Sequence, residues 1–333
     1  MSGPRDERYY QPVQSATQQG AEMGGRGPVR EVPEGQVRSY YGKGVVKQPV
    51  WTWEVPWYLF FGGLAGASSG LCLAARVAGN HSLARRALLV ALGGAAVSPV
   101  LLISDLGRPE RFYMMLRVFK PTSPMSMGTW ILSAFGTTTG AAVAADLLGI
   151  LPKLGRTAEV ASALLGPPLA TYTAVLLSDT SVPTWHEARK ELPFVFAASS
   201  TASAGAAAAI LTSTEQAGAA RRLAIGGAIA EIATSEYMKR RLGKLLAEPY
   251  KNDKAGRYEK LSTALTCASA TVIGVLGRRS RIAAAVGGTG ILAGAIFKRW
   301  SVFEAGVESA RDPKYVVLSQ RERLRDRNGS SGE

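Results

Sequence analysis

Cysteine and histidine are scarce in this chain of 333 residues, which contains two of each. An iron–sulfur cluster needs four protein ligands, mostly thiolates, and a membrane cytochrome with two haems needs four axial ligands on its helices. Cys72 and Cys267 lie far apart in apolar segments, and His81 and His186 lie in predicted loops. The chain alone therefore cannot ligate a cluster or a haem pair, and a disulfide is not expected.

Charged residues are missing from long stretches of the middle of the chain. The mean hydropathy is only +0.06, but this average hides a polar arm at 1–50, an apolar region at 51–300 and a polar tail at 301–333. The apolar region divides into eight runs near the roughly 20 residues that a spanning helix needs. We therefore predict an all-α polytopic membrane protein, with a largely irregular arm and tail. The predicted spans are 57–78, 84–105, 128–150, 158–179, 193–214, 219–240, 261–277 and 282–299.

An apolar signal segment is also lacking near Met1, so we expect the first span to act as its own insertion signal. Eight spans place both termini on one side of the membrane. That side carries about twice as many Lys and Arg residues as the other, which predicts a multi-pass protein of the cell inner (plasma) membrane with cytoplasmic termini. The net charge of +14 then reflects topology and contact with anionic lipid, and no nucleic acid is needed to explain it.

Acidic residues near membrane depth are rare in proteins and are candidates for a functional site. Glu54 begins the first predicted span, Asp105 ends the second, and Glu231 lies near the middle of the sixth. Asp105 has two interpretations: an ion pair with Arg108 that closes the helix end, or a polar group inside a pocket. Glu231 has no cation one turn away, and its depth favours a proton-handling or pocket role.

Aromatic residues gather at the start of the first span, where Trp and Tyr are typical of a membrane boundary. They are Trp51, Trp53, Trp57 and Tyr58. The loop after the fourth span carries Asp179 and His186, and it is either part of a site or a plain solvated turn. A third segment, 101–130, turns at Gly107 and Pro109, and its residues 110–120 have the pattern of a short amphipathic helix in the membrane interface.

Three segments resemble the NrfD-like family, the membrane subunits of polysulfide-reductase-type oxidoreductase complexes. They are TWEVPWYLFFGGLAG (52–66), SDLGRPERFYMMLRVFKPTSPMSMGTW (104–130) and PTWHEARKELPF (183–194), within a resemblance over about 50–310. It implies eight helices in two four-helix bundles and no haem, cluster or metal in this chain. It also implies electron exchange between a quinone, menaquinone or ubiquinone, and a docked ferredoxin-like iron–sulfur subunit. A molybdopterin-dependent catalytic subunit, such as a formate dehydrogenase, is the further partner implied.

Quinone chemistry requires a proton donor near each carbonyl oxygen, and this requirement assigns roles to the candidate residues. We predict that Asp105 donates the proton, with Glu54 or Glu231 behind it. The predicted binding residues are Arg108, Trp53, Trp57, Tyr58, Asp179 and His186. The alternative functions are a purely structural membrane anchor for a soluble oxidoreductase, and a proton or small-solute transporter.

Overall fold

The computed structural model describes residues 45–319, which form helices joined by short loops. Long helices occupy all eight predicted positions, and the predicted all-α fold is confirmed. These helices are α2 (Glu54–Val77), α3 (His81–Ser104), α4 (Pro124–Leu148), α5 (Pro152–Ser178), α7 (Leu192–Leu211), α8 (Gly218–Arg241), α10 (Asp253–Leu276) and α11 (Arg281–Arg311). Most of the predicted arm at 1–50, and the end of the predicted tail, lie outside the described residues.

Six of the long helices within 45–319 are both long and apolar enough to cross a membrane, so the chain is a multi-pass membrane protein. They are α2, α3, α4, α5, α7 and α11. Helices α8 and α10 are 24 residues long, but charged side chains interrupt their apolar runs. For these two, the prediction of a span is supported by length and by their place beside α7 and α11.

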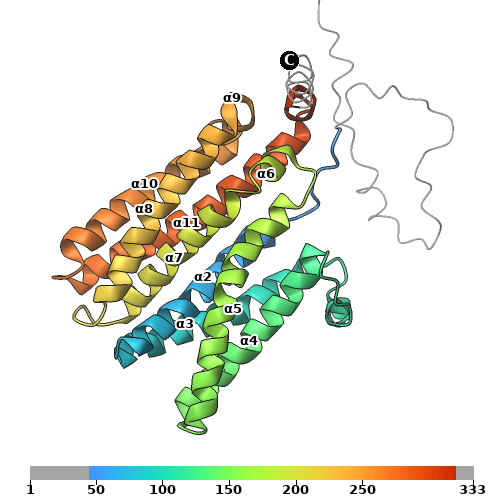
Figure 1. The fold of residues 1–333 in the computed structure, drawn as a ribbon. Coiled ribbons are helices and arrows are strands. Elements are labelled where there is room, and N and C mark those ends of the chain that lie inside the picture. Colours follow the sequence, from blue (N-terminus) through green and yellow to red (C-terminus); the bar gives the residue numbers. More distant parts are fainter. Residues whose placement is uncertain (1–44, 320–333) are drawn as a thin grey trace, which may run out of the picture. The chain divides into compact units, whose positions relative to one another are not determined.

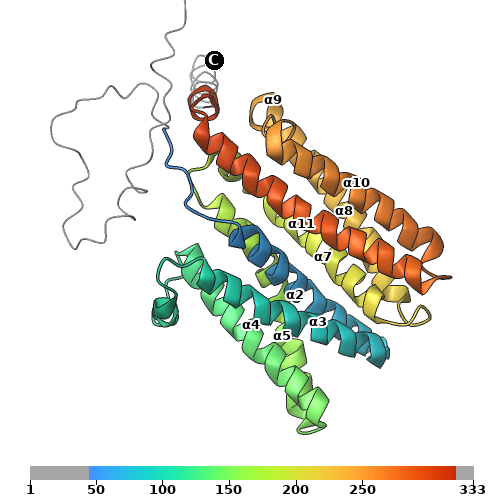
Figure 2. The same ribbon diagram turned by 180° about the vertical axis from the view of Figure 1, so that it is seen from behind.

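The eight long helices form two bundles, as predicted. Helices α2 to α5 pack together, and α7, α8, α10 and α11 form the second group (Figures 1 and 2). Helix α2 also packs on α7 and α11, so it has one side in each bundle. Three short helices lie in the loops at one end of the bundles: η2 (Pro109–Leu116), α6 (Pro183–Glu187) and α9 (Gly243–Leu246).

Helices α2 and α5 touch backbone to backbone at a pair of glycines. A Cβ atom added to Gly66 would lie 2.4 Å from the carbonyl oxygen of Gly166. On the next turn, the Ser69 hydroxyl donates to the Ser162 carbonyl oxygen at 3.2 Å. Small residues permit this approach in lipid, where packing drives helix association. The contact fixes how the two helices continue toward the end of the bundle where both carry pocket residues.

The last span is longer than predicted. Helix α11 continues to Arg311, well beyond the expected end at 299. Lys298 and Arg299 are the last two residues of the predicted span 282–299, and in the structure both are buried, with 2% and 0% exposure.

Burial is tolerated because buried groups bind both cations. Lys298 pairs with Glu259 and donates to the Ser235 hydroxyl. Arg299 donates to the hydroxyls of Ser199 and Ser200, although its Nε has no hydrogen bond within 45–319. The two residues therefore should not be counted among the loop Lys and Arg residues from which the orientation of the chain in the membrane is predicted.

Candidate functional site

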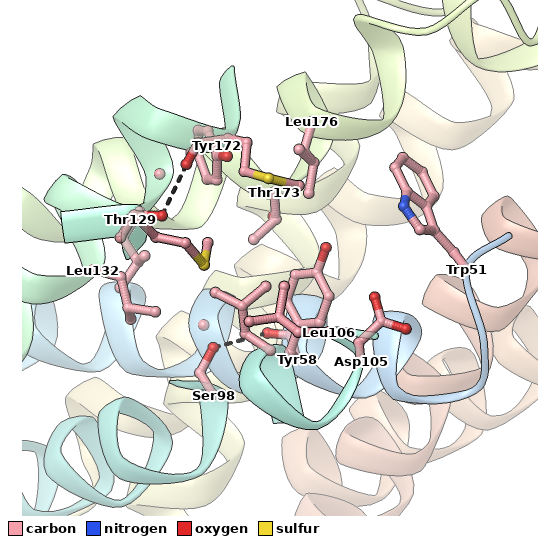
Figure 3. Close-up of a pocket in the computed structure, with 16 residues that line it drawn as sticks. Trp51, Tyr58, Ser98, Asp105, Leu106, Thr129, Leu132, Tyr172, Thr173 and Leu176 are labelled. Atoms are coloured by element: carbon pink, nitrogen blue, oxygen red, sulfur yellow. Dashed lines mark hydrogen bonds between the residues drawn. The ribbon is translucent and has the colours of Figure 1, made fainter. Parts of the chain in front are cut away.

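A mainly apolar pocket lies at one end of the first bundle, between the beginning of α2, the end of α3 and the facing parts of α4 and α5. Its cavity volume is about 60 Å³, and the space free of atoms, counted together with the solvent at its mouth, is about 640 Å³. Figure 3 shows its lining, with Trp51, Tyr58 and Asp105 close together and Tyr172 across the cavity. Met115 of η2 also lines the pocket, so the interfacial segment contributes to this site. The pocket is suited to a flat apolar molecule with a few polar atoms.

Asp105 caps the C-terminus of α3 and places a half-buried carboxyl at the pocket wall. The Thr52 hydroxyl donates to Asp105 Oδ1 at 3.1 Å, and the same hydroxyl contacts the Glu54 carboxylate. Burial raises the pKa of Asp105, the hydrogen bond from Thr52 lowers it, and the Glu54 charge raises it further; the net direction is upward. Asp105 therefore holds its proton to a higher pH than an ordinary aspartate.

Tyr58 lies one turn after Glu54 on α2, and its ring is buried against the pocket. Within 45–319 its hydroxyl makes no hydrogen bond, although Asp105 and Tyr172 are both near enough to interact with it electrostatically. A phenol that can both donate and accept, beside a carboxyl of raised pKa, is an arrangement that can hydrogen-bond a carbonyl oxygen and transfer a proton.

Tyr172 of α5 forms the opposite wall, and its position is fixed by α4. Its hydroxyl donates to the Pro124 carbonyl oxygen at the start of α4. The ring lies directly over Gly128, where an added Cβ atom would be only 2.0 Å from the ring carbons. A glycine at 128 is therefore required for this wall. Pro124 and Gly128, which contact Tyr172, both belong to the SPMSMG segment on which the family resemblance is partly based.

Trp51 closes the pocket toward the second bundle. Its ring stacks on that of Trp185, with centroids 5.6 Å apart and an interplanar angle of 23°. Trp185 belongs to α6, is fully buried, and donates from Nε1 to the Val302 carbonyl oxygen of α11 at 2.7 Å. A residue that the sequence assigned only to a membrane-boundary belt is thus a wall of the pocket, held from behind by the PTWHE segment.

The structure brings together only some of the predicted site residues. Tyr58 and Asp105 line the pocket, and Glu54 joins Asp105 through Thr52. Trp53 is 57% exposed and Trp57 stacks on Phe61; neither lines the pocket.

The remaining candidates lie elsewhere. Arg108 is exposed at the start of η2 and, within 45–319, makes no ion pair with Asp105, so the helix-end pair considered from the sequence does not form. Asp179 and His186 are exposed in the loop after α5. Glu231 is buried in the second bundle, at 1% exposure.

Sequence reasoning missed the polar residues that α3 and α5 contribute. Ser98 donates to the Tyr58 carbonyl oxygen at 3.3 Å, and Thr173 lines the pocket one residue after Tyr172. Hydroxyl residues in apolar helices are common, so their spacing gave no distinct signal. Among the described residues, no group of three or more His, Cys, Asp or Glu side chains is placed to hold a metal ion.

Comparison with known families decides the identity of the chain. Residues 43–245 match the family model described as "Polysulphide reductase, NrfD". The chain belongs to this family. The match includes the whole first bundle, the pocket and helices α7 and α8, and it confirms the resemblance seen in the sequence. As an NrfD family member, the chain is the membrane subunit of a polysulfide-reductase-type oxidoreductase complex. A comparison with curated proteins found no significant match.

Proposed function

We propose that this NrfD subunit binds a quinone, menaquinone or ubiquinone, in the pocket between Trp51 and Tyr172. The observation that carries the proposal is the pair formed by the half-buried Asp105 and the unbonded Tyr58 hydroxyl inside an apolar pocket. A quinone head group is flat and apolar, with two oxygens that require hydrogen-bond donors. The fit between these needs and the lining supports a quinone over a hydrophilic substrate.

The bound quinone would supply the two-electron chemistry, and this chain would bind it and handle its protons. Tyr58 and Asp105 would donate hydrogen bonds to one carbonyl oxygen, and the Asp105 carboxyl would supply one of the two protons that reduction to the quinol takes up. Glu54 lies behind Asp105 at the same Thr52 hydroxyl, where it can replace that proton from the bundle end. Trp51 and Tyr172 flank the ring and exclude water from it.

The position of the pocket at one end of the bundles suggests where a partner subunit docks. In our proposal a ferredoxin-like iron–sulfur subunit docks there and exchanges electrons with the quinone, and a molybdopterin-dependent enzyme such as a formate dehydrogenase completes the complex. The η2 segment offers exposed Phe112 and Tyr113 beside exposed Arg111 and Arg117, a mixture typical of interaction surfaces. The charge bias of the sequence favours a cytoplasmic location for this end, so in our proposal the partner docks on the cytoplasmic side.

The test is quinone-dependent turnover of the purified complex. Asp105→Asn and Tyr58→Phe should each lower the rate, Asp105→Asn by about 100-fold, the scale of a lost proton donor. Asp179→Asn is the matched control, because Asp179 also caps a span but is exposed outside the pocket. Each variant must retain its partner subunits and its activity with an artificial acceptor.

The same experiment separates the proposal from a structural anchor. An anchor predicts that Asp105→Asn and Tyr58→Phe keep full turnover whenever the complex assembles. Equal rates for the Asp105, Tyr58 and Asp179 variants would overturn the proposed pocket.

A further inference from the structure

A second cavity lies in the first bundle, at the opposite end from the pocket. It lies between the last turn of α2, the last turns of α4 and the first turns of α5, and its volume is about 260 Å³. A cavity of about 10–15 Å³ already holds one water, so a much larger group fits here. This cavity, which we call the hairpin cavity, is lined by the charged side chains of Arg76, Asp146, Arg156 and Glu159.

The two acids of the hairpin cavity are already paired with arginines. Arg76 donates to Glu159 from Nε at 3.2 Å and 3.1 Å and from Nη2 at 2.8 Å, and its Nη2 also donates to Asp146 Oδ1 at 3.4 Å. Arg85 pairs with Oδ2 of Asp146 at 3.2 Å. Every carboxylate oxygen of the two acids thus contacts an arginine. The cavity is therefore poorly suited to bind a further cation.

Positive charge remains after this pairing. Arg156 lines the cavity and, within 45–319, makes no hydrogen bond or ion pair. Among the same residues, Nη1 of Arg76 has no hydrogen-bond partner either. Lys153 is exposed on the same turn of α5 as the lining residues. With Arg85, four cations thus surround two acids, and this surplus of positive charge attracts an anion.

The first turn of α5 also favours an anion. The helix begins at Pro152, and Leu151 before it, with a φ of 49°, supplies no side-chain cap. Pro152 and Gly155 of this turn line the cavity. The first N–H groups of a helix are donors without intrahelical partners, and the helix dipole favours negative charge beside them. Phosphate oxygens suit both these N–H groups and the planar guanidinium group.

The tip of the α4–α5 hairpin indicates where the phosphate comes from. Its large apolar side chains lie at the end of the first bundle (Figures 1 and 2) and have exposed fractions of 51% to 68%. They are Leu147, Leu148, Ile150, Leu151 and Leu154. Such a group of exposed apolar residues is unfavourable in water and is typical of a surface that contacts lipid or a partner. A cationic cavity beside an apolar tip matches the phosphate and the acyl chains of a phospholipid.

We propose that the hairpin cavity binds an anionic phospholipid. Its phosphate is held by Arg156, by Nη1 of Arg76 and by the first turn of α5, and its acyl chains lie on the apolar tip of the hairpin. The lipid then connects α2 with the α4–α5 hairpin. The inference is independent of the quinone function, because the cavity lies at the other end of the bundle and shares no lining residue with the pocket.

Native mass spectrometry of the purified complex, stripped of lipid by detergent exchange, tests the site. On titration with phosphatidylglycerol, the wild type should bind one molecule more tightly than the rest. Arg156→Gln should weaken this binding about 10-fold, the scale of one charge-assisted contact. Arg156 is exposed and has no partner within 45–319, so its replacement should leave the fold intact.

The matched control is Arg279→Gln. Arg279 is exposed in the loop between α10 and α11, at the same end of the molecule, and it does not line the cavity. This variant should bind phosphatidylglycerol as the wild type does. Equal affinities for the Arg156 and Arg279 variants would overturn the inference. Phosphatidylcholine, whose headgroup has no net charge, should bind more weakly than phosphatidylglycerol, and equal binding of the two lipids would contradict an anion site.

A second pair of variants distinguishes a phospholipid from free phosphate. Leu154→Gln removes an apolar contact for an acyl chain and should weaken phosphatidylglycerol binding several-fold. Ile282→Gln, at a position 77% exposed at the start of α11, should not. Inorganic phosphate at matched ionic strength should fail to displace the lipid. Displacement by inorganic phosphate, together with wild-type affinity in Leu154→Gln, would show a site for a free anion and contradict the assignment to a lipid.

Discussion

The Trp51 indole stacks on the Trp185 indole with ring centroids 5.6 Å apart. Trp51 belongs to the pocket of the first bundle, while Trp185 is hydrogen-bonded to Val302 of α11 in the second. The contact therefore makes the shape of the pocket depend on how the two bundles meet. It also explains why the PTWHE segment, which carries no pocket residue itself, is part of the functional end of the molecule.

Trp185→Leu should weaken quinone binding with little effect on the maximal rate. The substitution removes the stack that holds Trp51, and an aromatic pair contributes about 0.5–1.5 kcal/mol beyond its buried area. We expect the KM for quinone to rise about 2-fold to 10-fold while kcat changes little. Trp53→Leu, at a position 57% exposed, is the control. The role of Trp185 would be contradicted by an unchanged KM in an assembled complex.

The acid–base behaviour of Asp105 should respond in opposite directions to its two neighbours. Thr52→Val removes a hydrogen bond that lowers the pKa of Asp105, so the pKa should rise and turnover should persist to higher pH. Glu54→Gln removes a negative charge that raises this pKa, so the same limb of the pH profile should move to lower pH. The measurement is quinone-dependent turnover as a function of pH. Shifts in the same direction for both variants would exclude Asp105 as the titrating group.

The glycine contact between α2 and α5 should be sensitive to a single methyl group. Gly66→Ala places a Cβ atom 2.4 Å from a backbone oxygen that cannot rotate away, and we expect a loss of about 1–3 kcal/mol in the free energy of unfolding. Gly70→Ala, one turn further on the same helix, meets no atom within 4 Å and should be neutral or stabilising. Thermal unfolding of the detergent-purified subunit distinguishes the two variants. Similar midpoints would show that the helices separate without difficulty.

The buried ion pair of the second bundle should matter far more than an exposed one. Lys298→Met leaves Glu259 with one cation fewer in a buried site, and breaking such a pair costs about 3–5 kcal/mol. Lys314→Met breaks the pair with Glu248, in which both side chains are more than a third exposed, and should cost about 0–1 kcal/mol. Chemical denaturation of the two variants provides the comparison. Equal losses would contradict the buried position of Lys298.

The fold could be predicted because each helix has its own pattern within a short stretch of the sequence. Each span is an apolar run bounded by loops, so all eight long helices could be predicted, with most ends within a few residues. There are two exceptions. Helix α10 begins at Asp253, well before the predicted start at 261. Helix α11 runs past its predicted end, because Lys298 and Arg299 resemble the flank of a span when only the sequence is considered. Their burial depends on Glu259 and on serines of α7, which no spacing within α11 reveals.

Residues of the candidate site could be predicted only where the residue type was unusual or typical for its place along a span. Asp105 was found because a carboxyl at a helix end near a Gly–Pro turn is unusual, and Tyr58 because aromatics gather at the membrane boundary. Trp51 and Tyr172 were missed as pocket walls because their roles depend on contacts with Trp185 and Pro124 across the fold. The spacing of Arg108 from Asp105 suggested an ion pair, but among the described residues the two form none, and Arg108 is exposed at the start of η2.

The central claim is that a quinone occupies the pocket, and extraction of bound quinone from the purified complex tests it most directly. Leu132→Trp fills the pocket from α4 without changing Asp105 or Tyr58, and Leu147→Trp makes the same substitution on the same helix at a position 54% exposed. Mass spectrometry of solvent extracts should find about one quinone per subunit in the wild type and in Leu147→Trp, and little in Leu132→Trp. Equal amounts in the two variants, or none in the wild type, would contradict the account.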